Sequence, residues 1–301
     1  MIKDFLSIED LSKKEIIEII DFAKQFKSDD GSFRKEDLFP DKTIANIFCE
    51  PSTRTKSSFE IAAKNLGCTV IDFDVASSSI QKGESIYETI DALSLMGVDL
   101  CVLRHKDSVI RELAPNMQDI IFINAGEGTI SHPTQTLIDL MTIKDYKSSL
   151  DNLNILIFGD LDHSRVTTSF CEGISKFSSN NITFSGEPSM CTQYQNSNLG
   201  KYEPNLDKAI IDADVIMALR IQHERFETDT SLNLDEYKQS FGLTSERLDL
   251  ARGDVILMHP GPVNFIEISE NVYNLDNTVI REQVANGVAI RMAVLSRFLS
   301  S

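Results

Sequence analysis

The sequence predicts an α/β protein that contains two doubly wound parallel sheets. Short apolar runs alternate with amphipathic segments along most of the chain, which indicates repeated strand–helix–strand units. Most of these runs are continuously apolar, as is typical of parallel strands that are covered on both faces. At 301 residues the chain is also long for one hydrophobic core, so two domains of about 150 residues each are expected.

Eight apolar runs are expected to form strands, because each is bounded by polar or glycine-containing segments. They are Ile44–Phe48, Thr69–Phe73, Leu100–Leu103, Ile120–Asn124, Asn154–Phe158, Asn181–Ser185, Val215–Leu219 and Val255–Met258. Eight amphipathic segments are expected to form helices, namely 8–27, Lys56–Leu66, Ser85–Met96, Ser108–Met117, Pro133–Lys144, His163–Lys176, Asn205–Ala213 and Thr278–Leu299. Residues Glu224–Leu243 are polar with few apolar anchors, and we expect them to form a loop.

The domain boundary is expected near Lys144–Asn152, a polar stretch that follows a long helix and precedes a new strand. We therefore expect one domain over residues 1–131 together with 285–301. The second domain is expected over residues 149–284, and residues 132–148 are expected to form a connecting helix.

Composition narrows the classes of function. The chain has 46 acidic and 29 basic residues and a net charge of −17, which disfavours nucleic acids and anionic membranes as partners. Five cysteines without a C-x-x-C pair argue against a zinc site and against disulfides, and we expect Cys49, Cys68 and Cys101 to be buried thiols. No signal peptide or membrane-spanning run is evident, so a cytoplasmic location is expected.

The segment Glu50-Pro51-Ser52-Thr53-Arg54-Thr55 joins the first expected strand to the first helix of that sheet. A helix N-terminus binds phosphate well, because its N–H groups and the positive end of its dipole point at the same place. One Ser or Thr at this position could simply cap the helix. This segment, however, has three hydroxyls beside an arginine, which favours an anion site.

Cations or His-Pro pairs follow nearly every expected strand. They are Arg54, Lys82, Arg104, His132, Arg165, Arg220 and His259. Any one of them alone is more often a solvated loop residue or a structural histidine. Because ligands bind beyond the carboxyl ends of parallel strands, the whole set predicts one polyanion site in the cleft between the two domains.

The missing motifs restrict the chemistry of this site. There is no Ser–His–Asp order for covalent catalysis, no G-x-G-x-x-G for a nicotinamide cofactor and no Walker loop for a nucleotide. We expect no cofactor and no metal. Transfer between small anions, driven by positioning and electrostatic stabilisation, is the chemistry that the pattern favours.

Three motifs together resemble the aspartate/ornithine carbamoyltransferase family, and the resemblance extends over essentially the whole chain. They are Phe48–Thr55, His132-Pro133-Thr134-Gln135 and His259-Pro260-x-Pro262. The resemblance implies transfer of the carbamoyl group of carbamoyl phosphate to an amino acid. The lysine loop and Arg220-x-Gln222 favour L-aspartate as acceptor, since the D-x-x-S-M-G loop and H-C-L-P turn of the ornithine enzymes are missing. The products would be N-carbamoyl-L-aspartate, used in pyrimidine biosynthesis, and phosphate.

The resemblance also implies a role for each matched residue. The first domain would bind carbamoyl phosphate, and the second would bind aspartate. Carbamoyl phosphate would contact Ser52, Thr53, Arg54, Thr55, Ser78, Lys82, Arg104, His132, Gln135, Pro260 and Gly261. Aspartate would contact Lys82, Arg165, Arg220 and Gln222. The catalytic residues would be Arg54, Thr55, Lys82, Arg104 and His132, of which Thr55, Arg104 and His132 would stabilise a tetrahedral oxyanion after direct attack by the amine.

The family further implies a homotrimer in which Ser78 and Lys82 enter the site of a neighbouring subunit. A regulatory chain or a dihydroorotase as additional partner is left open by the sequence. Two alternative functions are also open. The chain could transfer carbamoyl groups to another amino acid, or it could be a non-catalytic scaffold subunit with the same fold.

Overall fold

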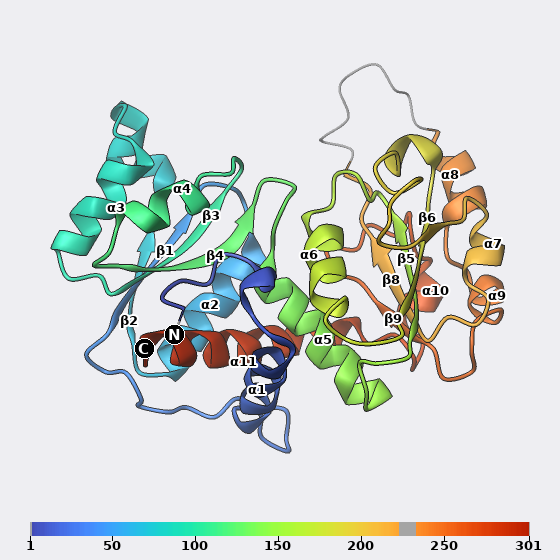
Figure 1. The fold of residues 1–301 in the computed structure, drawn as a ribbon, viewed down its shortest axis with the longest axis horizontal. Coiled ribbons are helices and arrows are strands. Elements are labelled where there is room, and N and C mark those ends of the chain that lie inside the picture. Colours follow the sequence, from blue (N-terminus) through green and yellow to red (C-terminus); the bar gives the residue numbers. More distant parts are fainter. Residues whose placement is uncertain (1, 223–232, 301) are drawn as a thin grey trace. The chain divides into compact units, whose positions relative to one another are not determined.

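The computed structural model describes residues 2–222 and 233–300. The chain divides into two compact units, Met1–Ile138 with Ala285–Ser301, and Asp139–Val284 (Figure 1). Each unit contains one parallel sheet with helices on both faces, so the predicted class of two doubly wound α/β domains is confirmed. No helix within the described residues is long and apolar enough to cross a membrane.

The sheet of the first unit has four parallel strands in the order β2-β1-β3-β4. They are β1 (Thr43–Phe48), β2 (Thr69–Phe73), β3 (Leu100–His105) and β4 (Ile121–Glu127). The chain first moves outward from β1 to β2 and then returns to place β3 on the other side of β1. The winding therefore reverses between β1 and β3, and at such a switch point the carboxyl ends of two neighbouring strands are left uncovered.

Helices cover both faces of this sheet. The unit contains α1 (Lys13–Gln25), α2 (Thr53–Asn65), α3 (Ile86–Leu95), α4 (Ile110–Leu113), and parts of α5 (Pro133–Lys147) and α11 (Ile280–Leu299). Figure 1 shows α3 and α4 on one face and α2 and α11 on the other. The strand residues Ala45 and Ile47 are fully buried in one core cluster with residues of α3 and α4. The N- and C-terminal segments meet where the rings of Phe5 and Phe298 stack with centroids 5.5 Å apart.

The sheet of the second unit has five parallel strands in the order β7-β6-β5-β8-β9. They are β5 (Asn154–Gly159), β6 (Asn181–Ser185), β7 (Lys201–Tyr202), β8 (Val215–Leu219) and β9 (Ile256–Met258). The helices are α6 (Arg165–Ile174), α7 (Leu206–Ala209), α8 (Leu234–Phe241), α9 (Ser245–Leu248) and α10 (Glu270–Tyr273). In this unit the winding reverses between β5 and β8.

Gly159 allows the close approach of the two strands at this second switch point. Its φ is +119°, and a Cβ atom at this position would lie 2.3 Å from the carbonyl oxygen of Leu219 on β8. Only glycine accepts both conditions without displacing the backbone. The carboxyl ends of β5 and β8 can therefore lie directly side by side.

All eight predicted strands are present, and the structure adds the two-residue β7. The predicted helix over residues 8–27 is divided into a 3₁₀ turn at Ile8–Asp10 and α1, because Ser7 and Ser12 each form a capping box. The predicted helix Ser108–Met117 is likewise divided into α4 and a 3₁₀ turn at Ala114–Asn116, which contains a proline.

The predicted loop Glu224–Leu243 is wrong over its second half. Residues 224–232 lie outside the described residues, but α8 occupies Leu234–Phe241. The amide of Asn233 caps this helix, accepting from the N–H groups of Asp235 and Glu236. Buried Tyr237 and Phe241 are one helical turn apart, with ring centroids separated by 5.3 Å, and they form the apolar face of the helix. Two apolar residues in a polar segment are too few to indicate a helix from composition.

Candidate active site

The N-terminus of α2 lies at the first switch point and has no side-chain cap. Its N-cap residue Ser52 has extended backbone angles, yet its hydroxyl accepts no hydrogen bond from the first turn, and that turn contains no acidic residue. By contrast, Ser12 on α1 and Ser85 on α3 both form complete capping boxes with a glutamate. Ser52 thus does not cap the first turn of α2, and a helix N-terminus without a side-chain cap suits a bound anion.

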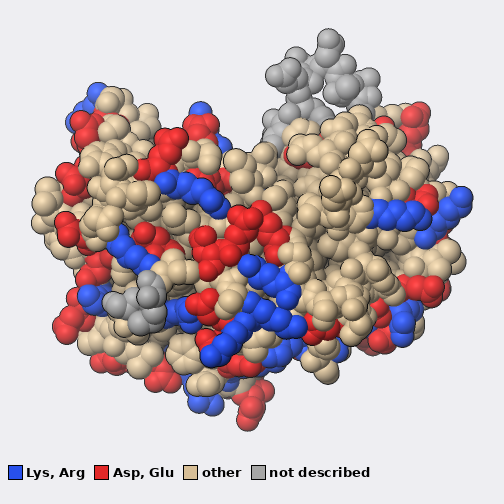
Figure 2. Space-filling view, viewed as in Figure 1, with Lys and Arg blue, Asp and Glu red and all other residues tan. Residues whose placement is uncertain are grey.

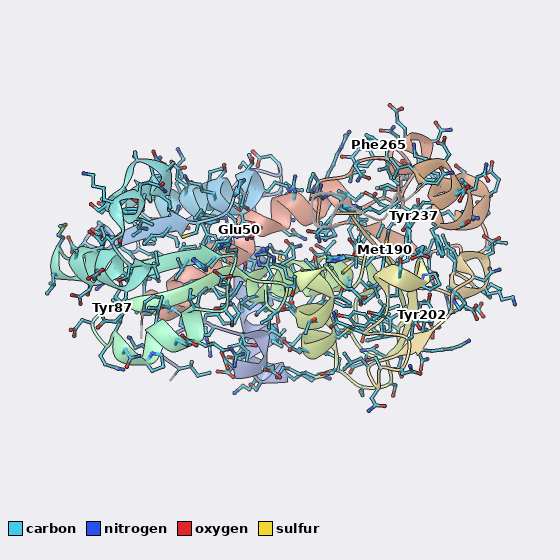
Figure 3. All side chains as sticks on the ribbon, turned by 90° about the horizontal axis from the view of Figure 1, so that it is seen from above. Glu50, Tyr87, Met190, Tyr202, Tyr237 and Phe265 are labelled. Atoms are coloured by element: carbon cyan, nitrogen blue, oxygen red, sulfur yellow. The ribbon has the colours of Figure 1, made fainter. Side chains whose placement is uncertain are left out.

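Arg104 lies next to this helix start, at the carboxyl end of β3. It pairs in register with Phe48 of β1, and its carbonyl accepts the N–H of Cys49 at 2.9 Å. Its guanidinium Nε lies 3.3 Å from Oε2 of Glu50, and both side chains are mostly buried. Glu50, labelled in Figure 3, belongs to the turn between β1 and α2. The ion pair therefore links the two strands on either side of the switch point.

His132 reaches the same edge of the sheet from β4, the neighbour of β3. A tight turn follows β4, in which Glu127 donates its N–H to the carbonyl of Ser131 at 2.9 Å. His132 comes next, is 5% exposed, and accepts the N–H groups of Gln135 and Thr136 through its carbonyl as α5 begins. Ser52–Thr55, Arg104, His132 and Gln135 thus all lie beyond the carboxyl ends of three adjacent strands.

Ser78 and Lys82 lie elsewhere in the strand order. Two 3₁₀ turns follow β2, Val75–Ser77 and Ser79–Lys82; Ser78 lies between them and Lys82 ends the second. The hydroxyl of Ser78 donates to the carbonyl of Val75 at 2.8 Å, and Lys82 is exposed. Because β2 is an edge strand, this segment begins on the side of β1 away from β3 and the first switch point.

The second unit repeats the arrangement of the first. Arg165 is the first residue of α6 and is 7% exposed, and the N-cap residue Ser164 makes no side-chain cap. Arg220 and Gln222 follow β8, which is the strand next to β5. The second switch point therefore also combines an uncapped helix N-terminus with arginine side chains.

Asp160 holds the second switch point together. Its carboxylate is fully buried, with one oxygen 2.7 Å from Nδ1 of His163 and the other accepting the N–H of Gln222 at 3.2 Å. The side-chain amide of Gln222 then donates to the carbonyl of His163 at 2.7 Å. These bonds fix the loop after β5 to the loop after β8.

Pro260 and Gly261 follow β9, the third strand in the series β5-β8-β9, in a turn held by His259 and Glu267. They therefore lie at the same edge of the second sheet as Arg165, Arg220 and Gln222. On the face drawn in Figure 2, acidic and basic side chains are interspersed over both units. Because the whole chain has a net charge of −17, the arginines at the carboxyl edge of the second sheet are a local concentration of positive charge.

All five cysteines are free thiols. Cys68 and Cys101 are buried as expected, whereas Cys49, beside Glu50, is only half-buried. Burial, with a smaller contribution from the Glu50 carboxylate, raises the pKa of Cys49 to about 11. Burial likewise raises the pKa of the Cys68, Cys101, Cys171 and Cys191 thiols. Thiols in this state stay protonated near neutral pH, so the cysteine at the first switch point is a poor nucleophile.

Three acidic residues that hold predicted residues in place were not predicted from the sequence. Glu50, Asp160 and Glu267 contact Arg104, Gln222 and His259 respectively. Glu50 and Asp160 directly follow strands, as the predicted cations do. Their position after a strand is therefore visible in the sequence, but a carboxylate by itself does not indicate an anion site.

Comparisons with known proteins agree with this arrangement. The model of the aspartate/ornithine carbamoyltransferase carbamoyl-P binding domain matches residues 3–145, and that of the Asp/Orn binding domain matches residues 151–298. The aspartate carbamoyltransferase catalytic subunit of Caldanaerobacter subterraneus subsp. tengcongensis is 42% identical over 97% of this chain and 96% of that protein. The corresponding subunit of Campylobacter hominis is 41% identical over 99% and 98%.

Solved structures are also similar. The catalytic subunit of M. Jannaschii aspartate transcarbamoylase matches with a TM-score of 0.86 and 34% identity over 99% of this chain and 98% of that one. Aspartate transcarbamoylase from Trypanosoma cruzi, in complex with carbamoyl phosphate and aspartate, matches with a TM-score of 0.85 and 30% identity over 97% and 95%. The family resemblance that the motifs predicted is therefore confirmed.

The missing cap of α2 predicts a difference between two matched serines. Helices α1 and α2 each have 13 residues and a serine at the N-cap, but only Ser12 makes cap hydrogen bonds. We expect Ser12→Ala to lower the free energy of unfolding by about 0.5–2 kcal/mol, and Ser52→Ala to change it by less than about 0.5 kcal/mol. Urea unfolding in phosphate-free buffer measures both values. Equal losses in the two variants would show that Ser52 caps its helix.

Proposed function

Because the chain belongs to the aspartate/ornithine carbamoyltransferase family, we propose that it is an aspartate carbamoyltransferase. The enzyme transfers the carbamoyl group of carbamoyl phosphate to the amino group of L-aspartate. The products are N-carbamoyl-L-aspartate and phosphate. We place the reaction in pyrimidine biosynthesis, as the resemblance implies, and in the cytoplasm, the location expected from the sequence.

One observation carries this proposal: each unit presents an uncapped helix N-terminus beside strand-end cations at a switch point of its sheet. A chain with a net charge of −17 repels anions in general, so cations gathered at these two sites indicate that anions bind there. The two proposed substrates are both anionic. One carries a phosphate and the other carries two carboxylates.

The first unit supplies the site for carbamoyl phosphate in this proposal. The phosphate accepts hydrogen bonds from the first turn of α2 and from the side chains of Ser52, Thr53, Arg54 and Thr55. Arg104 and His132 contact the carbonyl oxygen of the carbamoyl group. Its NH₂ group is held by Gln135 and by the backbone carbonyls of Pro260 and Gly261.

The second unit supplies the site for aspartate. Arg165 and Arg220 each pair with a carboxylate, because the planar fork of a guanidinium matches the two oxygens. Asp160 holds Gln222 in place beside them through its N–H group, and Gln222 adds a polar contact to the substrate. A cationic acceptor such as ornithine would meet two arginines here, and the carboxylate of Asp160 is fully buried and already accepts a hydrogen bond from Gln222, which favours the acidic substrate.

The reaction proceeds by direct attack. The neutral amine of aspartate forms a C–N bond to the carbamoyl carbon, and the carbonyl oxygen becomes an oxyanion. Thr55, Arg104 and His132 donate to this oxyanion, and a typical donor of this kind contributes about 2.7–4 kcal/mol to transition-state stabilisation. The C–O bond to phosphate then breaks, and the departing phosphate takes the proton from the amine. No protein nucleophile is needed, in keeping with the protonated thiol of Cys49.

We further propose a homotrimer in which Ser78 and Lys82 complete the site of a neighbouring subunit. Support comes from the sheet order, since these residues follow an edge strand and not the switch point. Lys82 is exposed, so its ammonium group is available to a neighbouring chain. In that site it contacts both substrates and adds a positive charge beside the phosphate.

The acceptor is identified by activity measurements. We expect equal amounts of phosphate and N-carbamoyl-L-aspartate from carbamoyl phosphate and L-aspartate, and a rate at least about 100-fold lower with L-ornithine. Arg220→Ala should raise KM for aspartate by about 30-fold or more, because one carboxylate loses its charged partner. The matched control is Arg252→Ala, since Arg252 precedes β9 and pairs with Asp214 at the amino end of the sheet.

Two results would contradict the proposed acceptor. A folded protein that releases no phosphate from these substrates would favour a non-catalytic scaffold. A rate with another amino acid that exceeds the rate with aspartate would assign a different acceptor. If Arg252→Ala raises KM as much as Arg220→Ala does, the effect of Arg220 is a general charge effect.

Subunit sharing predicts complementation between two inactive variants. Lys82→Ala and Arg54→Ala should each be inactive alone, but mixed, dissociated and reassembled chains should regain activity at about one quarter of the sites. Those sites combine Arg54 from one chain with Lys82 from its neighbour. The control mixes Arg54→Ala with Arg104→Ala, which lie in the same site of one chain and should regain nothing. Failure of the first mixture to regain activity would place Lys82 in its own subunit's site.

A further inference from the structure

The turn after β9 contains a buried histidine whose hydrogen bonds identify its protonated nitrogen. The His259 side chain is fully buried, with Nδ1 2.8 Å from the N atom of Gly261 and Nε2 2.8 Å from Oε1 of Glu267. A backbone N–H can only donate, so Nδ1 is the acceptor and has no proton. The proton is therefore assigned to Nε2, which donates to Glu267 and leaves the ring neutral.

This tautomer determines where the Pro260 carbonyl points. Among the described residues only the Gly261–Pro262 bond is cis, so the Pro260–Gly261 peptide is trans and planar. In a trans peptide the C=O and N–H groups point in opposite directions. Because the Gly261 N–H points at the ring of His259, the Pro260 carbonyl must point away from it. The φ of Gly261 is +73°, which a glycine adopts without steric cost.

The histidine is itself held on both its ring and its backbone. Its N–H donates to Oε1 of Gln283 at 2.9 Å, and the amide nitrogen of Gln283 donates to Asp139 at 2.6 Å. Glu267 is fully buried and also accepts the N–H of Asn264 at 3.3 Å. Side chains locked in this way by buried hydrogen bonds can hold a backbone group within the narrow tolerance that a reaction needs.

We propose that His259 is a positioning residue for the carbamoyl group. The inference rests on the proposed function, in which the carbonyls of Pro260 and Gly261 accept hydrogen bonds from the carbamoyl NH₂. The neutral ring itself touches no substrate. It holds the Gly261 N–H, and through the rigid peptide plane it aims the Pro260 carbonyl at the substrate. With a proton on Nδ1, two donors would face each other and the peptide would have to turn.

Two amide variants separate this role from simple packing. In His259→Asn the side-chain oxygen can take the place of Nδ1 and accept the Gly261 N–H, whereas in His259→Gln the amide reaches toward Glu267 and leaves that N–H without its acceptor. We expect the glutamine variant to raise KM for carbamoyl phosphate about tenfold, and the asparagine variant to raise it less than about threefold. Inorganic phosphate has no NH₂ group, so its Ki as an inhibitor should stay unchanged in both.

The other outcomes overturn the inference in recognisable ways. If His259→Gln keeps the wild-type KM for carbamoyl phosphate, the ring does not position the substrate. If both variants raise this KM and the Ki of phosphate together, with a lower Tm, the histidine has only a structural role. A folded wild-type protein without turnover would contradict the proposed function instead, and this is seen before any variant is made.

Discussion

The reversal of winding in each parallel sheet is the constraint on which the rest of the structure depends. Helices that leave β1 and β3, or β5 and β8, pass to opposite faces, so the carboxyl ends of these strands are left uncovered. Each switch point then needs local bonds to hold its two loops. At the first switch point Glu50 and Arg104 form an ion pair, and at the second the carboxylate of Asp160 accepts hydrogen bonds. Gly159 allows β5 and β8 to approach each other closely at the second switch point. Most of the predicted binding residues lie at these switch points, whereas His132 and Gln135 follow the neighbouring strand β4, Pro260 and Gly261 follow β9, and Ser78 and Lys82 follow the edge strand β2.

The two helices without a serine cap, α2 and α6, both begin at a switch point. A serine cap typically stabilises a helix by about 0.5–2 kcal/mol, and α1 and α3 have such caps. Helices α2 and α6 also start with a serine, but its hydroxyl is not used for capping. Stability that is absent from the free protein can be supplied by a ligand that binds only the folded state. In the proposed function, phosphate oxygens take the place of the serine cap at the N-terminus of α2. Selection for binding explains this departure from ordinary helix design better than selection for stability.

The strands and the positions of their ends could be predicted from the sequence, because both depend on local patterns. Continuous apolar runs predicted eight strands, and the cations after them predicted that the binding residues lie at the carboxyl edges of the sheets.

The helix and loop predictions were wrong where local patterns compete or are weak. Two capping boxes divide the first helix, Pro115 ends another, and α8 has only two buried aromatic residues within a polar segment. The pairs formed by Arg104 with Glu50 and Gln222 with Asp160 join residues 54 and 62 positions apart. Such contacts depend on the tertiary fold, so periodicity and spacing cannot reveal them.

In the proposed site, the N-terminus of α2 binds a phosphate while the arginines of the second unit bind carboxylates. A crystal structure with a bisubstrate analogue that carries a phosphonate and two carboxylates tests it most directly. We expect the phosphonate to accept hydrogen bonds from the first-turn N–H groups of α2 and from Arg54. We expect the two carboxylates to pair with Arg165 and Arg220, and Lys82 to enter from another subunit. A phosphonate bound away from α2, or carboxylates that contact neither arginine, would rule out this site.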